Sequence, residues 1–463
     1  MEHLLPLLLV CSFLFTVAAP ARDITSVCAS QTTDFPQLDS SGLHLTLHHP
    51  QSPCSPAPLP SDLPFSTVLT HDDARVAHLA ARLATNNNDA PPRRPTSLRK
   101  KKATVDDSLA TVPLSPGTSI GVGNYVTQLG LGTPATSYAM VVDTGSSLTW
   151  LQCSPCVVSC HRQAGPLFDP KSSSTYASVP CSASQCDELQ AATLNPSACS
   201  NSGVCVYQAS YGDSSFSVGY LSKDTVSFGS GSFPNFYYGC GQDNEGLFGR
   251  SAGLIGLARN KLSLLYQLAP SLGYSFSYCL PTSASTGYLT IGSYSPGQYS
   301  FTPMASSSLD ASLYFVTLSG MSVGGSPLAV SPSEYASLPT IIDSGTVITR
   351  LPTSVYTALS KAVAAAMAAS GVQSAPAFSI LDTCFEGQAS QVRVPAVSMA
   401  FAGGATMKLT ARNVLIDVDD STTCLAFAPT DSTAIIGNTQ QQTFSVVYDV
   451  GQSRIGFAAG GCS

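Results

Sequence analysis

Two short strings, 200 residues apart, constrain this 463-residue chain more than any other feature. Residues 140–147 read MVVDTGSS and residues 340–346 read TIIDSGT, so that Asp143 and Asp343 each follow an apolar run and precede a glycine turn. One Asp-x-Gly string is ordinary turn chemistry, but two copies in matching contexts indicate a functional pair. Two adjacent carboxylates share a proton, so that one can deprotonate a water molecule while the other polarises a carbonyl group. This chemistry requires no metal or cofactor, and we expect none.

The surroundings of the two strings read as an internal repeat. Residues 125–127 (YVT) precede the first aspartate and residues 315–317 (FVT) the second, while 253–256 (GLIG) and 434–437 (AIIG) follow them. Short runs of Val, Ile, Thr and Tyr dominate the chain from residue 112 onward, which is too long for one compact core. We therefore predict a mostly β fold of two lobes with a cleft between them.

Both aspartate loops and both apolar-apolar-Gly segments together resemble the pepsin-type aspartic proteases, from about residue 112 to the end. The resemblance implies the bilobal pepsin-like fold and an aspartic-type endopeptidase that hydrolyses peptide bonds at acid pH. Its partner would be a peptide or protein substrate bound in extended conformation, with apolar side chains around the cut bond. We expect a monomer.

The resemblance also assigns supporting roles inside the two loops. The hydroxyl directly after each aspartate would brace the loops across the lobe interface, and the hydroxyl three residues after it would hydrogen-bond the carboxylate. With the loop glycines, the supporting residues are Thr144, Gly145, Ser146, Ser344, Gly345 and Thr346.

Residues 210–215 (SYGDSS) are typical of a hairpin that closes over substrate, as a flap does in this family. Tyr211 is the flap candidate, with Gly212 and Asp213 beside it, and Trp150 resembles the tryptophan that supports such a flap. The alternatives are a strand tyrosine packed on the sheet and an ordinary core tryptophan.

Cysteines refine the family. Of fifteen, Cys11, Cys28 and Cys54 lie before residue 112, and the remaining twelve are an even number, which favours a closed set of disulfides. Seven crowd between Cys153 and Cys205, an insertion that resembles the plant nepenthesin-type enzymes. That resemblance implies the pairs Cys153-Cys156, Cys160-Cys240, Cys181-Cys205, Cys186-Cys199, Cys279-Cys462 and Cys384-Cys424.

The spacing of Cys153, Cys156, Cys160 and His161 would also suit a zinc ion, and Cys-x-x-Cys a redox pair. Disulfides are favoured because the N-terminus resembles a secretion signal: residues 4–17 form an apolar run, which Ala18 and Ala19 follow. We expect a signal peptide at 1–19 and a secreted protein, extracellular or vacuolar, in preference to a plastid one. No membrane anchor is expected.

Residues 20–111 resemble a propeptide, followed by lobes at 112–310 and 311–463. Nine of the 21 basic residues and six of the seven histidines precede residue 112. Residues 73–83 predict an amphipathic helix that packs on the mature enzyme, with basic groups pairing to acidic groups until low pH protonates them. Residues 86–108 read equally as a charged, disordered linker.

Other function classes are disfavoured by counting. The basic run at 99–102 could contact phosphates, but the chain from residue 112 carries 12 basic and 18 acidic residues, a net charge of −6, so nucleic acid is not expected. His161 is the sole histidine there, which disfavours Ser-His and Cys-His catalysis. The rival hypothesis is a catalytically inactive protein-binding or glycosidase-inhibitor protein on the same scaffold, which plant xylanase inhibitors resemble.

Overall fold

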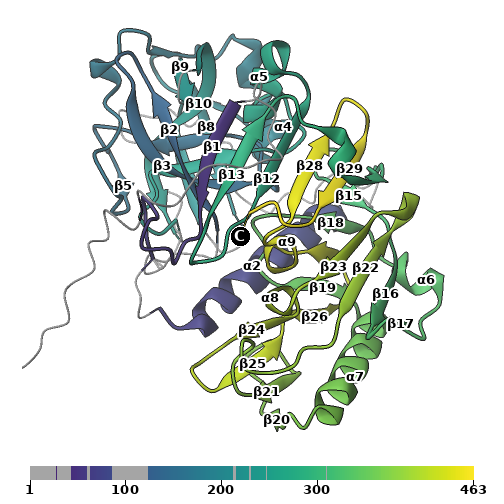
Figure 1. Cartoon of the computed structure of the whole chain (residues 1–463). Coiled ribbons are helices and arrows are strands. Elements are labelled where there is room, and N and C mark those ends of the chain that lie inside the picture. The colour runs from purple at the N-terminus through teal and green to yellow at the C-terminus, as the bar shows by residue number, and fades with distance from the viewer. Residues whose placement is uncertain are drawn as a thin grey trace, which may run out of the picture.

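The computed structural model describes residues 28, 43–59, 63–85, 124–211, 215–228, 231–246, 248–308 and 310–462. Two β-rich lobes lie side by side, the N-terminal one in blue and teal and the C-terminal one in green and yellow (Figure 1). This confirms the predicted bilobal, mostly β fold. The N-terminal lobe contains β2 (Val126–Leu131), β3 (Thr136–Asp143), β4 (Trp150–Gln152), β5 (Ser159–Cys160), β6 (Ala177–Ser178), α3 (Ser184–Asp187), α4 (Leu189–Thr193), β7 (Ala198–Cys199), β8 (Cys205–Ser210), β9 (Phe216–Phe228), β10 (Gly231–Glu245), β11 (Gly253–Gly256) and α5 (Leu264–Leu272).

The C-terminal lobe repeats the plan with shorter strands in three sheets. Its Ala-rich helix α7 (Thr353–Ala369) packs on β16, β19 and β26 through Val355, Leu359 and Val363. The other elements are β15 (Phe315–Val316), β16 (Leu318–Val323), β17 (Ser326–Pro327), α6 (Pro332–Tyr335), β18 (Thr340–Ile342), β19 (Thr349–Pro352), β20 (Ser374–Ala375), β21 (Cys384–Glu386), β22 (Val397–Phe401), β23 (Thr406–Leu409), α8 (Ala411–Val414), β24 (Leu415–Asp417), β25 (Thr422–Leu425), β26 (Phe427–Thr430), β27 (Ala434–Ile436) and α9 (Asn438–Gln441).

The internal repeat predicted from the sequence appears as two copies of one strand motif. In the N-terminal lobe β3 runs parallel to β11, β11 antiparallel to β4, and β4 parallel to β10. In the C-terminal lobe β18, β27, β19 and β26 have the same order and directions. A Cβ on Gly256 or Gly437 would lie 2.3 Å or 2.7 Å from a carbonyl oxygen of the neighbouring aspartate loop, which explains the glycine that ends each crossing segment.

A sheet that runs between the lobes joins strands from distant parts of the chain: β12 (Ser275–Cys279), β13 (Thr286–Ile291), β14 (Ser300–Pro303), β28 (Ser445–Asp449) and β29 (Arg454–Ala458). The N-terminal segment adds β1 (Leu43–His48), which lies between β13 and β2. Its sequence, LHLTLH, alternates, and Leu45 and Leu47 are buried. The sequence analysis missed this strand.

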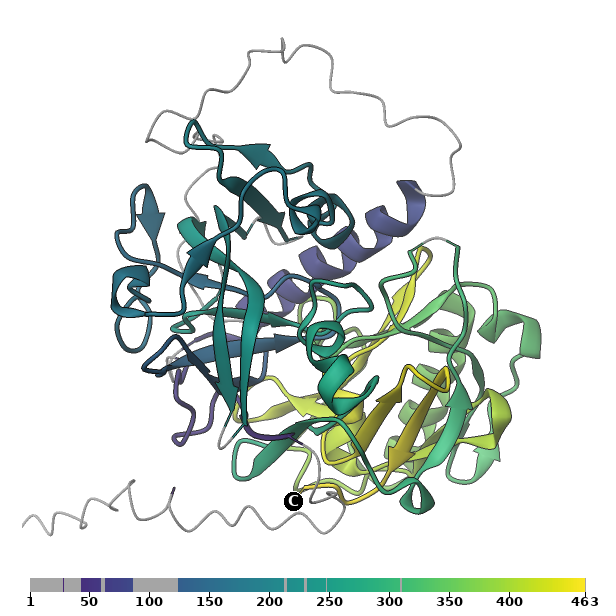
Figure 2. The ribbon, with the colours of Figure 1, turned by 90° about the horizontal axis from the view of Figure 1, so that it is seen from above.

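Helix α2 (Phe65–Thr85) of the same segment lies between the two lobes (Figures 1 and 2). It includes residues 73–83, so the predicted amphipathic helix is confirmed. Its buried apolar side chains lie along one side of the helix and pack on the C-terminal lobe. They are Val68, Leu69, Val76, Leu79 and Leu83.

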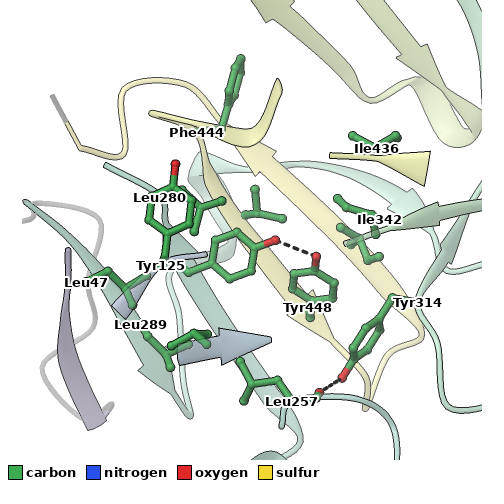
Figure 3. Packing of buried hydrophobic residues seen from close by; sticks show 14 of the residues in the cluster. Leu47, Tyr125, Leu257, Leu280, Leu289, Tyr314, Ile342, Ile436, Phe444 and Tyr448 are labelled. Carbon is green, nitrogen blue, oxygen red and sulfur yellow. Dashed lines mark hydrogen bonds between the residues drawn. The ribbon is translucent and has the colours of Figure 1, made fainter. Parts of the chain in front are cut away.

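One apolar core continues from lobe to lobe behind the cleft. Figure 3 shows Ile342 and Ile436, from the C-terminal copy of the strand motif, near Tyr448, and Tyr314, whose hydroxyl donates to the Leu257 carbonyl at 2.7 Å. Within β3, Val142 faces this core, whereas Val141 faces a second core under the flap. Because β3 is buried on both faces, the position of Asp143 at its end is held rigidly.

Four of the six expected disulfides are wrong. Cys279-Cys462 and Cys384-Cys424 form as expected. In place of Cys153-Cys156, Cys160-Cys240, Cys181-Cys205 and Cys186-Cys199, the pairs are Cys153–Cys240, Cys156–Cys160, Cys181–Cys199 and Cys186–Cys205. An additional pair, Cys28–Cys54, lies within the N-terminal segment.

The physical reason for the first correction is the strand arrangement. β4, which leads into Cys153, runs parallel to β10, which carries Cys240, and so brings these two cysteines together. Since every sulfur of the proposed zinc or redox site is in a disulfide, neither alternative is supported. No helix in the described part of the chain is long and apolar enough to cross a membrane.

Candidate active site

The two aspartate loops meet at the bottom of the cleft. The Thr144 backbone N–H donates to Ser344 Oγ at 3.3 Å, and the Ser344 N–H donates to Thr144 Oγ1 at 2.9 Å. Asp143 and Asp343 are almost fully buried, and each accepts a hydrogen bond from the backbone N–H of its own loop glycine, at 3.0 Å and 3.3 Å. The reciprocal pair of hydrogen bonds holds the loops in one relative position.

Glycine is required in both loops because the opposite carboxylate approaches so closely. A Cβ on Gly145 would lie 2.9 Å from Asp343 Oδ1, and one on Gly345 would lie 2.7 Å from Asp143 Oδ1. The same Cβ atoms would lie 2.6 Å and 2.4 Å from Arg75, so any larger residue forces the carboxylates or the arginine to shift.

The hydroxyls three residues after the aspartates behave differently. Thr346 Oγ1 donates to Asp343 Oδ2 at 2.6 Å, as expected. Ser146 Oγ makes no such bond and has no hydrogen-bond partner within the described residues, so the expectation for Ser146 is wrong in this state. The Asp143 oxygens instead take their donors from Gly145 and from Arg75 of α2.

Arg75 is a residue of the candidate site that the sequence analysis missed. Its Nη2 donates to Asp143 Oδ1 at 2.6 Å and to Asp343 Oδ1 at 3.0 Å, and its Nε donates to Asp343 Oδ2 at 2.9 Å. One guanidinium nitrogen, Nη2, thus lies between the two carboxylates and donates to an oxygen of each. The structure thus brings Asp143 and Asp343 together and places Arg75 in contact with both.

Helix α2 supplies one positive charge, that of Arg75, beside the two carboxylates. Burial opposes ionisation of Asp343, but Arg75, Thr346 and Gly345 hold the pKa of its carboxyl below the ordinary value. Burial likewise opposes the charge on Arg75, and the two carboxylates outweigh it and raise the pKa of the guanidinium. The arginine therefore favours the ionised form of Asp343.

A second ion pair anchors α2 one turn before Arg75. The buried Asp72 accepts hydrogen bonds from the backbone N–H groups of Val347 and Ile348, at 2.5 Å and 3.2 Å, and lies 3.1 Å from Arg350 Nη2. Burial raises the pKa of Asp72, and Arg350 and the two backbone donors oppose the rise. Asp72 therefore ties the helix to the loop that follows Asp343.

The candidate flap tyrosine, Tyr211, contacts Trp150, the residue expected to support it. The Trp150 indole N–H donates to the Tyr211 hydroxyl at 2.7 Å, and Phe248 packs edge-on against both rings. Gly212 and Asp213 lie outside the described residues. A pocket remains between α2 and the N-terminal lobe, lined in part by Tyr211, Phe248 and Leu194.

Comparison with known proteins places this site in a family. Residues 125–293 match the family model described as xylanase inhibitor N-terminal, and residues 313–459 match xylanase inhibitor C-terminal. An aspartyl protease of Arabidopsis thaliana is 38% identical over 95% of this chain and 91% of its own length. The aspartic proteinase nepenthesin-2 of Nepenthes gracilis is 36% identical over 74% of this chain and 78% of its own. The chain belongs to the plant nepenthesin-like, pepsin-type aspartic protease family.

Solved structures agree on the fold of this family member. The basic 7S globulin from soybean, 19% identical, superposes with a TM-score of 0.58 over 73% of this chain and 93% of its own. At this identity the similarity concerns the fold alone.

Proposed function

We propose that this protein is an aspartic endopeptidase that hydrolyses peptide bonds in proteins at acid pH, and that residues 20–111 form a propeptide that keeps it latent. The observation that carries the proposal is the position of Arg75 between Asp143 and Asp343. A single basic side chain bound to both carboxylates is what a reversible block of this chemistry requires, because it satisfies their charge and excludes water.

Removal of Arg75 would leave two adjacent carboxylates with one shared proton. The ionised carboxylate takes a proton from water as the oxygen attacks the carbonyl carbon, and the protonated one hydrogen-bonds the carbonyl oxygen. Collapse of the tetrahedral intermediate breaks the C–N bond, and the nitrogen leaves with the transferred proton. The loop glycine N–H groups and Thr346 hold the carboxylates in position for these transfers.

The surface that α2 covers indicates which substrates would bind in the cleft after the helix has left. Val76, Leu79 and Leu83 pack against an apolar surface of the C-terminal lobe that includes Phe315 and Ile341. Once the helix leaves, this surface is open to the side chains of an extended peptide. This supports apolar residues beside the cut bond.

The test is proteolysis of an unfolded protein from about pH 2.5 to about pH 8 by the acid-treated chain, beside Asp143→Asn and Asp343→Asn variants. We expect cleavage in acid alone, reduced by about 10²–10⁴-fold or more in either variant. Asp420→Asn, at an exposed site, is the matched control and should cleave like the wild type.

The second candidate is a non-catalytic binding protein, which the xylanase-inhibitor description of the family model favours. A wild-type chain that cleaves nothing after the N-terminal segment has been removed would overturn the protease proposal in favour of this one. Delivery to the extracellular space or vacuole is part of the proposal. Residues 1–19, which would form the signal peptide, lie outside the described residues.

A further inference from the structure

A second arginine of α2 occupies a separate site built entirely from the lobes. Arg82 donates from Nε and Nη2 to Asp310 Oδ2 at 3.1 Å and 2.6 Å, from Nη2 to Ser312 Oγ at 3.1 Å, and from Nη1 to the Gly145 carbonyl at 2.9 Å. The Arg82 and Asp310 side chains are only 12% and 9% exposed. Gly145 belongs to the first aspartate loop, so the site directly adjoins the pair formed by Asp143 and Asp343, the candidate catalytic dyad.

The acceptors of this site are prepared for a cation. The Ser312 backbone N–H and hydroxyl donate to Asp310 Oδ1 at 2.9 Å and 2.6 Å, which leaves Oδ2 directed at the guanidinium. Burial opposes ionisation of Asp310, but Arg82 and the two Ser312 donors hold the pKa of its carboxyl below the ordinary value. The Ser312 donors belong to the lobes and remain when the helix leaves.

We propose that, once α2 has left the cleft, the site formed by Asp310, Ser312 and the Gly145 carbonyl binds a basic side chain, arginine above all, of the peptide substrate. The inference rests on the proposed function, since it assumes that a substrate replaces the helix. A buried carboxylate facing a carbonyl and a hydroxyl suits the several N–H groups of a guanidinium better than any neutral side chain.

The helix also gives the distance of this site from the dyad. Arg82 follows Arg75 by seven residues, which is about 10 Å along an α-helix. An extended peptide covers about 10 Å in three residues. The basic residue is therefore expected about three positions from the bond that is cut, on one side only.

The experiment uses peptides that differ at one position, with Ala, Arg, citrulline or Glu placed at the second, third or fourth residue on either side of the cut bond. Citrulline keeps the shape of arginine and removes its charge. With the acid-treated chain we expect kcat/KM to be about tenfold higher for Arg than for citrulline at one of these positions, mainly through KM, and lowest for Glu. In Asp310→Asn this Arg-to-citrulline ratio should fall to about one, while Asp420→Asn should keep the wild-type ratio.

The outcomes separate the two proposals. Normal cleavage with a ratio of about one at every position would overturn the basic site and leave the protease function standing. If no peptide is cleaved, the protease proposal fails. Calorimetry of the binding of a synthetic peptide of residues 63–85 to the acid-treated chain then tests whether the site binds arginine. Binding about tenfold weaker with citrulline at position 82 supports it, and equal binding overturns it.

Discussion

At the scale of single residues, the choice of arginine at position 75 is chemically specific. Its planar guanidinium presents several N–H groups, so that Nη2 can reach both Oδ1 atoms while Nε reaches Asp343 Oδ2. A lysine would offer one compact charge in place of this fork. The block on the dyad should therefore depend on this side chain more than on any other of the helix.

We predict that Arg75→Ala makes the full-length chain active without acid treatment. Removing the guanidinium leaves two buried carboxylates without a counter-charge, which weakens docking of α2 and frees the site for water. The measurement is the rate of peptide cleavage by the uncut chain near pH 5. Arg412→Ala, which removes an exposed arginine, should stay as latent as the wild type; equal latency of Arg75→Ala would contradict the assignment.

Tyr211→Phe tests the flap. It deletes the hydroxyl that accepts from Trp150 and leaves the ring on Phe248. Since one net hydrogen bond is worth about 1 kcal/mol, we expect kcat/KM to fall about fivefold with an unchanged pH profile. A shifted pH profile would mean that the tyrosine acts on the dyad and not on flap closure.

The residues of the dyad were predictable because their signal is local and repeated. In each loop the aspartate, the glycine and the bracing hydroxyl are neighbours in the sequence. The geometry of the loop follows from these residues. Arg75 gave no such signal. The helix that carries it was predictable from the spacing of apolar residues, but the two aspartates that Arg75 contacts lie 68 and 268 residues away in the sequence. Ser146 does not bond Asp143, which accepts from Gly145 and Arg75 instead, and no local motif could reveal the arginine.

At the scale of elements, α2 combines an apolar face with charged anchors. Leu69 and Leu79 are 0% and 2% exposed and pack on the C-terminal lobe, while Asp72 and Arg75 project from the same side. Packing supplies the affinity of the helix for the cleft, and the ion pairs fix its register.

We predict that Leu69→Ala or Leu79→Ala moves release of α2 to higher pH. Loss of a buried leucine costs about 2–5 kcal/mol, and one pH unit per proton is worth about 1.4 kcal/mol, so the midpoint should rise by about one unit or more. Hydrogen exchange of residues 65–85 against pH measures it. Ala77→Ser, on the exposed face, is the control; an unmoved midpoint in the leucine variants would show that packing does not hold the helix.

Two features show what sequence alone could and could not provide for the elements. Strand β1 was missed although Leu43, Leu45 and Leu47 alternate cleanly, so the signal was present. The disulfides of the insertion were not derivable in the same way, because Cys181 and Cys186 lie five residues apart and either can reach Cys199 or Cys205 until the strands are placed.

At the scale of the whole molecule, latency should depend on pH with a definite sign. Arg75 holds the pKa of Asp343 low against the effect of burial, so this contribution to docking is present above the pKa of the released carboxyl and is lost as pH falls through the docked value. Loss of this contribution in acid favours the released state. Asp72, whose pKa burial raises in the docked state, works in the opposite direction.

We predict that hydrogen exchange of residues 65–85 in the uncut chain increases as the pH falls below about 5 and reverses when neutral pH is restored. The dyad should dominate because both of its carboxylates contact Arg75. Protection that grows stronger in acid would show that Asp72 controls the equilibrium instead.

The placement of α2 has a further consequence for concentration. Helix and cleft belong to one chain, so the block is intramolecular and dilution cannot weaken it. Within the described residues no disulfide joins the N-terminal segment to the lobes, since Cys28 pairs with Cys54. A single cut of the chain between residues 86 and 123 would make binding of α2 to the cleft a bimolecular equilibrium. Before the cut, this binding depends on the effective concentration of the helix within its own chain. After the cut, dilution of the released segment as well as pH would determine what fraction of the clefts stays occupied by the helix.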